Sequence, residues 1–112
     1  MVQSREVVTA EMRKQFKDPE DDIMFQENIT KISSWGFSQQ RVLAVTIDHV
    51  YVFTGSQMSR KHRITNLGAI IMSNISSELV LHFPRMKDLR ITGLSKERQQ
   101  ELIHICQLRF IN

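Results

Sequence analysis

Apolar residues near the N-terminus recur every four positions. Val8, Met12 and Phe16 follow this spacing within residues 4–17, which contain no glycine or proline, as in an amphipathic helix. The acidic stretch that follows, residues 18–22, includes a proline. Proline disfavours helix in the residue before it, and the charged side chains prefer water. We therefore predict a helix with one apolar face, followed by a solvated linker.

From Phe25 onward the apolar period falls to two, and β-branched and aromatic residues become frequent. Both features are typical of β-strands. Polar or proline-bearing turns separate the apolar runs, and a turn at Asp48 and His49 should join two strands as a hairpin. Seven strands are expected: residues 27–34, 41–47, 50–54, 60–64, 67–73, 78–83 and 89–91.

The last part of the chain returns to a helical period. Ser95 can cap the helix, and Glu97 lies in the first turn, where the helix dipole favours a negative charge. An apolar stripe follows: Leu102, Ile103, Cys106 and Phe110. Seven strands and one helix predict a mainly β fold, a small barrel or bent sandwich capped by the C-terminal helix. We assign residues 1–22 to the N-terminal helix and acidic linker, and residues 23–112 to the barrel.

Composition restricts the protein class. The chain has 112 residues, of which 41% are hydrophobic and 24% charged, as in one ordinary globular domain. No apolar run is long enough to cross a bilayer, and the N-terminus lacks the apolar region of a signal peptide. The single cysteine, Cys106, has no internal disulfide partner. We expect a soluble, cytoplasmic protein.

The net charge of +3 conceals an uneven distribution. Residues 1–30 contain four Lys or Arg against seven Asp or Glu, a balance of −3, and residues 31–112 contain eleven against five, a balance of +6. A basic domain attracts polyanions, which leaves lipid headgroups, nucleic acids and acidic protein surfaces as candidate partners. The aromatic residues lack the spacing of an RNA-stacking surface, so we expect no nucleic acid partner.

The densest cationic cluster contains four consecutive residues: Arg60, Lys61, His62 and Arg63. In a strand, two of these side chains point to each face, and a phosphate group favours such donors. Lys31 and Arg41 flank the loop of residues 33–40 and should face the same open end, which predicts a headgroup-binding pocket. The alternative is that the basic run protects an edge strand against aggregation.

Within that loop, Trp35 and Phe37 lie on either side of Gly36. Exposed aromatic residues would insert into a membrane interface, which tryptophan favours. The alternative is that Trp35 folds back onto the barrel. A later turn carries three more cations: Arg85, Lys87 and Arg90. For these we favour a solvated turn over a second ligand contact.

Motifs of catalysis are absent from the sequence. It has no phosphate-binding glycine loop, nucleophile elbow, HExxH motif or paired cysteines, and its four histidines lack metal-ligand spacing. Cys106 lies on the apolar stripe of the last expected helix, where a core thiol is the simplest interpretation. We expect no catalytic residue, no metal and no cofactor.

The order of these segments resembles that of a known family. An apolar run at residues 51–53 precedes the basic strand at 60–64, and residues 67–73 and 78–84 follow. This order resembles a pleckstrin-homology domain, most of all the tail-homology modules of class I myosins and the pleckstrin-homology domains of protists, including an acylated type that senses phosphatidic acid. The resemblance covers residues 25–112 and implies a seven-stranded barrel closed by a helix.

The resemblance also implies a function. Phosphoinositide-binding members carry three spaced basic residues across their first two strands, and Lys31 and Arg41 match the first two places while Leu43 occupies the third. This departure favours a small phosphomonoester over a polyphosphorylated ring. We therefore expect a monomeric, peripheral membrane protein that binds anionic phospholipids, phosphatidic acid ahead of phosphoinositides. The alternative is a protein-interaction module, since one fold supports unrelated functions.

Overall fold

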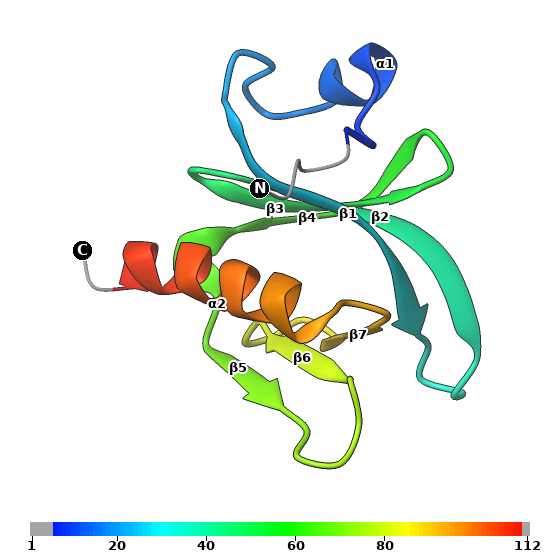
Figure 1. Ribbon diagram of the computed structural model, residues 1–112. Helices are drawn as coiled ribbons and strands as arrows, with labels where there is room; N and C mark the ends of the chain where they lie inside the picture. Colours follow the sequence, from blue (N-terminus) through cyan, green and yellow to red (C-terminus); the bar gives the residue numbers. More distant parts are fainter. Residues whose placement is uncertain (1–5, 111–112) are drawn as a thin grey trace.

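The computed structural model describes residues 6–110, and for the last two of these the backbone alone (Figure 1). Seven antiparallel strands form one bent sheet in the order β4-β3-β2-β1-β7-β6-β5. The mainly β fold with a C-terminal helix is confirmed. The strands are β1 (Ile23–Ile32), β2 (Ser38–Thr46), β3 (His49–Thr54), β4 (Gln57–Arg63), β5 (Ala69–Met72), β6 (Leu79–His82) and β7 (Leu89–Thr92).

Strand ends differ from the expected ones where backbone pairing continues into residues of low strand propensity. His49 was expected in the β2–β3 turn, but it is the first residue of β3 and pairs with Arg63. β4 begins at Gln57 because its ladder with β3 extends down to the pair Thr54 and Gln57. Gly55, with a φ of 60°, makes the tight turn that joins these two strands.

The helix α2 (Lys96–Phe110) closes the inner side of the bent sheet (Figure 1). The expected N-cap is confirmed, because the Ser95 hydroxyl accepts a hydrogen bond from the Arg98 backbone N–H at 3.2 Å. Leu102 and Cys106 are fully buried in the main core, and Ile103 packs against it. The side chain of Phe110 lies outside the described part of the chain.

Arg98 fixes α2 against β1. Its guanidinium lies over the ring of Phe25, 4.1 Å from the ring centroid. It also donates to a carboxylate oxygen of Glu27 at 3.2 Å and to the backbone carbonyl of Gln26 at 2.9 Å. A cation–π contact and charge-assisted hydrogen bonds therefore attach the first turns of the helix to the first strand.

The predicted N-terminal helix over residues 4–17 was wrong in extent. The only helix in the described part of that segment is α1 (Ala10–Arg13), and residues 4 and 5 lie outside the described residues. The backbone N–H groups of Val7 and Val8 both donate to the side-chain carbonyl of Gln26, at 2.8 and 2.9 Å. Helix formation is delayed to Thr9, which caps α1 by accepting from the N–H of Met12.

The apolar residues of this segment nevertheless share one face, as their spacing predicted. Val8, Met12 and Phe16 are buried in a second core against residues of β2 and β3: Ala44, Tyr51 and Phe53. This second core lies on the side of the sheet opposite to α2, with α1 above the strands (Figure 1). The second half of β2, from Val42, and β3 are therefore covered on both faces, which explains the nearly continuous apolar sequence of these parts.

Candidate functional site

A hollow of about 420 Å³ lies where the β1–β2 loop, β4 and the β6–β7 turn meet. Three cationic residues line it: Lys31 near the end of β1, Arg60 on β4 and Lys87 in the β6–β7 turn. Trp35 and Met86 also contribute to its lining. We call this hollow the basic pocket.

Strand alternation brings Lys31 and Arg60 together. Lys31 is the last but one residue of β1 and pairs with Ile91, whose side chain is in the core. It therefore extends from the inner face of the sheet at its open end. Arg60 lies two residues before the buried His62 on β4, and so faces the same interior. Both cations belong to the mouth of the barrel.

Arg60 is held in place by two neighbours. One guanidinium nitrogen donates to the backbone carbonyl of Lys87 at 2.6 Å, and its Nε donates to Nε2 of His62 at 3.0 Å. These bonds tie β4 to the β6–β7 turn. Because the side chain is already fixed, an anion in the basic pocket would meet an oriented guanidinium without much further loss of side-chain entropy.

His62 was expected to contact a ligand as a cation, but the structure places it behind Arg60. It is buried, and its ring stacks on Phe83 with centroids 4.0 Å apart. Burial, and then the positive charge of Arg60, lower the pKa of His62 to about 4. The neutral ring serves as the acceptor that orients Arg60 and contributes no positive charge to the basic pocket.

Lys61 and Arg63, the remaining two members of the basic run, point to the other face of β4. Lys61 pairs with Tyr51, whose ring lies in the second core. Neither residue lines the basic pocket. The structure therefore divides the basic run two and two, as strand alternation predicted, and places Arg60 alone in the pocket lining.

Lys31 lies among other positive charges. Its pKa is lowered, first by burial and then by Arg60, Arg41 and Lys87. Arg41 is close enough to lower the pKa of Lys31, but it does not line the basic pocket. Its guanidinium donates to the backbone carbonyl of Gln40 at 2.7 Å. Mutual repulsion of this kind would be relieved by a bound anion.

One carboxylate is present in the lining. Asp88 contributes to the basic pocket, and its side chain is 2.6 Å from Nδ1 of His82. Arg90, on β7, is bound by Glu78 through two contacts of 2.7 and 3.2 Å. Arg90 is therefore already paired, whereas the side chains of Lys31 and Lys87 have no carboxylate partner in the described part of the chain.

Sequence reasoning favoured a solvated turn for Lys87, and Lys87 is indeed exposed in the β6–β7 turn, where it also lines the basic pocket. The cause is the pairing of β1 with β7, which sets Ile32 opposite Arg90 and brings the β6–β7 turn beside the β1–β2 loop. No local pattern in the sequence reports this long-range pairing. The basic character of the turn was the only available signal.

The aromatic residues of the β1–β2 loop are exposed. The exposed fractions of Trp35 and Phe37 are 86% and 68%, so the alternative in which Trp35 folds back onto the barrel is wrong. Gly36, with a φ of 84°, turns the loop. Ser33 closes it, since its N–H donates to the carbonyl of Phe37 at 2.9 Å and its hydroxyl accepts from the N–H of Phe37 at 3.0 Å. Two aromatic side chains thus extend into solvent beside the basic pocket.

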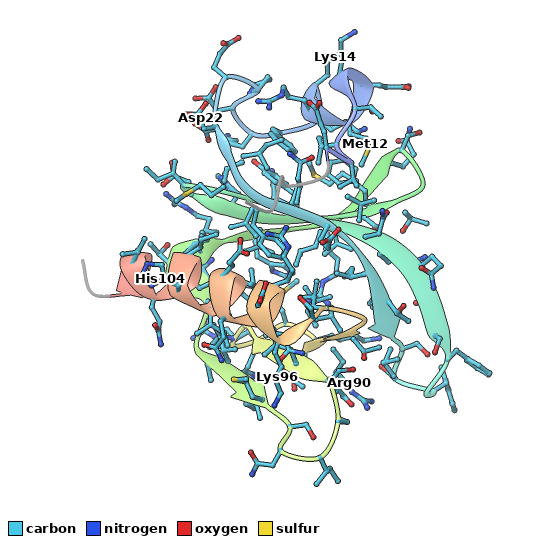
Figure 2. The ribbon with its side chains drawn as sticks, in the orientation of Figure 1. Met12, Lys14, Asp22, Arg90, Lys96 and His104 are labelled. Carbon is cyan, nitrogen blue, oxygen red and sulfur yellow. The ribbon has the colours of Figure 1, made fainter. Side chains whose placement is uncertain are left out.

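The acidic segment lies at the far end of β1 from this site. Figure 2 shows Asp22 where β1 begins and Arg90 near the opposite end of the strand. The strand has ten residues, so the two ends are about 30 Å apart. This separation gives the molecule an acidic end and a basic end, which would orient it in front of an anionic surface.

Within residues 6–110, no helix is long and apolar enough to cross a membrane. The described residues also contain no group of three or more His, Cys, Asp or Glu side chains arranged to hold a metal ion. Cys106 is buried, and burial raises the pKa of its thiol to about 11.

Comparison with known proteins identifies the fold. No family model matches the chain, and no curated protein matches its sequence. Among solved structures, the DH/PH domain of human ARHGEF11, in a ternary complex with human RhoA and its inhibitor, has a TM-score of 0.66 and 7% identity, over 80% of this chain and 29% of that one. The linker-DH/PH domains of p115-RhoGEF give a TM-score of 0.67 and 6% identity, over 84% and 30%.

The N-terminal PH domain of human ARAP2 gives a TM-score of 0.63 and 7% identity, over 74% of this chain and 75% of that one. The chain therefore spans about a third of the two exchange-factor chains and most of the isolated domain. At these identities the likeness concerns the fold alone, and that fold is the pleckstrin-homology fold.

Proposed function

We propose that this chain, which has the pleckstrin-homology fold, attaches itself to anionic membranes by holding a phosphate headgroup in the basic pocket. The observation that carries the proposal is the convergence of Lys31, Arg60 and Lys87 in one hollow beside the exposed Trp35. Cations bind the phosphate, and the aromatic loop enters the interface. The role is binding without catalysis, at the cytoplasmic face of a membrane and as a monomer.

Phosphatidic acid is the preferred ligand within this proposal, ahead of phosphoinositides. Leu43, at the third place of the basic motif, is fully buried in the core and offers no donor to a ring phosphate. Asp88 adds a negative charge to the lining, which disfavours ligands with several phosphates. One phosphomonoester, with three acceptor oxygens, matches two lysines and one guanidinium.

The expected affinity is modest. A cation near an anionic leaflet contributes on the order of 1 kcal/mol, so three give about 3 kcal/mol, which alone corresponds to millimolar binding or weaker. Burying Trp35 and Phe37 in the interface adds roughly 2 kcal/mol each. Together these terms support reversible attachment, in which the headgroup selects the membrane and the aromatic loop lengthens the residence time.

Liposome co-sedimentation at near-physiological salt tests the proposal. Phosphatidylcholine vesicles are compared with vesicles that also contain phosphatidic acid, phosphatidylserine or phosphoinositides at matched charge. The double variant Lys31→Glu/Lys87→Glu should lose binding. Lys61→Glu/Arg63→Glu changes the net charge by the same amount on the other face of β4 and serves as the control. Equal losses in both variants would indicate diffuse charge attraction, and the absence of binding to every anionic vesicle would refute the proposal.

A second candidate function is protein interaction on the same fold. β5 is an edge strand, and Ile71 and Met72 on it are 54% and 43% exposed. An extended peptide could pair with such an edge. Structures of similar fold include DH/PH domains of PDZ-RhoGEF in complex with activated RhoA. This alternative is favoured if zwitterionic and anionic vesicles are both ignored.

A further inference from the structure

A second hollow, of about 510 Å³, lies on the other side of the β6–β7 turn from the basic pocket. It is bounded by the 3₁₀ turn η1 (Ile64–Asn66), which follows β4, and by the start of the β6–β7 turn. We call it the lateral pocket. Its lining includes His62, Asn66 and Arg85, and Met86 lines both hollows. The two pockets are thus neighbours separated by one turn of the chain.

Arg85 has a backbone conformation that its residue type does not favour. Its φ is 71°, and it is the only residue other than glycine with a positive φ in the described chain. This region costs a side chain with a β-carbon on the order of 1 kcal/mol. The Arg85 side chain is exposed, and no hydrogen bond or ion pair of that side chain occurs in the described structure. Within the described structure, this guanidinium therefore makes no hydrogen bond or ion pair that would stabilise the fold.

The lateral pocket offers hydrogen-bond donors and no carboxylate. Nε2 of His62 accepts from Arg60, so the proton of the neutral ring is on Nδ1 and that nitrogen is a donor. Asn66 adds an amide group and Arg85 a guanidinium, and no Asp or Glu is part of the lining. A space lined by hydrogen-bond donors and by no carboxylate suits an anion. The basic pocket differs because its lining also contains the carboxylate of Asp88.

His62 also connects the two pockets. Its ring lines the lateral pocket, while its Nε2 holds the guanidinium of Arg60 that lines the basic pocket. Two anions, one in each hollow, would therefore act on the two nitrogens of one ring. Both bound anions would favour the same tautomer of His62, in which Nε2 is the acceptor and Nδ1 carries the proton.

We propose that the lateral pocket binds the phosphate of a second anionic lipid headgroup, so that the domain holds two neighbouring headgroups with the β6–β7 turn between them. This inference rests on the proposed function of the basic pocket. Arg85 is the phosphate-binding cation of the second site. Met86, with an exposed fraction of 57%, lies between the two headgroups and enters the interface. The apolar walls formed by Leu67 and Pro84 contact the uncharged part of the second lipid.

Two linked sites have a measurable consequence. Once one headgroup is bound, the second binding event takes place at a high effective concentration of lipid in the same surface. Binding to vesicles should then rise with about the second power of the mole fraction of phosphatidic acid. A domain with one site should follow the first power.

The substitution Arg85→Gly tests the second site without damage to the fold, because glycine adopts a positive φ readily. The thermal transition of Arg85→Gly should stay constant or rise. Its vesicle binding should fall to a first-power dependence, with roughly tenfold weaker binding at high mole fractions of phosphatidic acid. Arg85→Lys should keep most of the binding.

Two controls complete the experiment. Lys61→Gln removes one positive charge from the outer face of β4, and it should keep the second-power dependence. Inorganic phosphate, titrated by NMR, should still perturb the Lys31 and Lys87 resonances in Arg85→Gly, since the basic pocket is intact in that variant. An unchanged power for Arg85→Gly, or equal effects of Arg85→Gly and Lys61→Gln, would overturn the second site while the proposed function stands. Failure of the wild-type protein to bind any anionic vesicle would overturn both.

Discussion

The ring of Phe16 lies parallel to the ring of Tyr51, with centroids 4.4 Å apart and planes inclined by 2°. The Tyr51 hydroxyl also accepts a hydrogen bond from the backbone N–H of Lys17 at 2.9 Å. Burial, as the largest cause, raises the pKa of Tyr51. This contact attaches the segment before β1 to the outer face of the sheet. The segment therefore belongs to the folded structure and protects β3 from solvent.

Removal of the Phe16 ring should destabilise the protein without affecting the basic pocket. Phe16 is 4% exposed, and truncation of such a ring costs about 3 to 5 kcal/mol. Phe16→Ala should lower the free energy of unfolding in urea by this amount, while the folded variant still binds anionic vesicles. Tyr51→Phe keeps the stacking and should cost only about 1 kcal/mol. An unchanged unfolding midpoint for Phe16→Ala would mean that the second core contributes little.

Trp35 is the only tryptophan in the chain, so its fluorescence reports on one site. Its side chain is 86% exposed, and insertion into an interface should shift its emission to shorter wavelengths when anionic vesicles are added. Trp35→Ala should change the free energy of unfolding by less than about 0.5 kcal/mol and weaken vesicle binding about 30-fold. Emission that stays constant on binding would show that the loop remains in water.

Acid should destabilise the fold through His62. Its pKa is about 4 in the folded protein, against about 6.5 in an unfolded chain. Between these values the unfolded chain binds more protons, so the free energy of unfolding falls as the pH decreases from 6.5 towards 4. The total loss is on the order of 2 to 3 kcal/mol.

The measurement is urea unfolding of the wild type and His62→Gln across this pH range. In the variant, the free energy of unfolding should fall less steeply as the pH decreases. The difference in slope should correspond to at most about one bound proton per molecule. His104→Gln replaces an exposed histidine and provides the control. His49, whose pKa is also lowered, mainly by burial, is present in all three proteins and cancels in the comparison. Identical pH profiles for His62→Gln and the wild type would contradict the assignment.

Cys106 should report on opening of the barrel. It is fully buried between α2 and the sheet, and the raised pKa of its thiol leaves almost no thiolate at neutral pH. In the native protein, a thiol reagent should react orders of magnitude more slowly with Cys106 than with the denatured chain. Urea should raise this rate in proportion to the unfolded population. Rapid labelling without denaturant would show that α2 detaches from the core under native conditions.

Much of the fold could be predicted because its signals are local. Period-two alternation located all seven strands, and Ser95 with the stripe at Leu102 and Cys106 located α2. The N-terminal segment shows the limit of such signals. Val8, Met12 and Phe16 share a buried face as predicted, yet the Gln26 side chain takes the backbone N–H of Val8. A single long-range hydrogen-bond acceptor therefore changed the predicted helix into a short one.

The candidate site was only partly predictable for the same reason. Lys31 could be identified because it flanks a loop with two aromatic residues. Strand alternation correctly divided the run from Arg60 to Arg63 between two faces. Which face leads to the pocket was not encoded locally. Lys87 enters the lining through the pairing of β1 with β7, and His62 lost its expected charge because Phe83, twenty-one residues later in the chain, buries its ring.

The sequence by itself determined the period of each segment, the number of strands, the capping of α2 and the surplus of positive charge after residue 30. Those properties follow from interactions between residues close together in the chain. The tertiary structure alone decided which cations meet in the basic pocket, that Arg90 is paired with Glu78, and that Arg85 has a positive φ. Those outcomes depend on contacts between distant strands, such as the pair of Ile32 and Arg90, and on the burial that such contacts create.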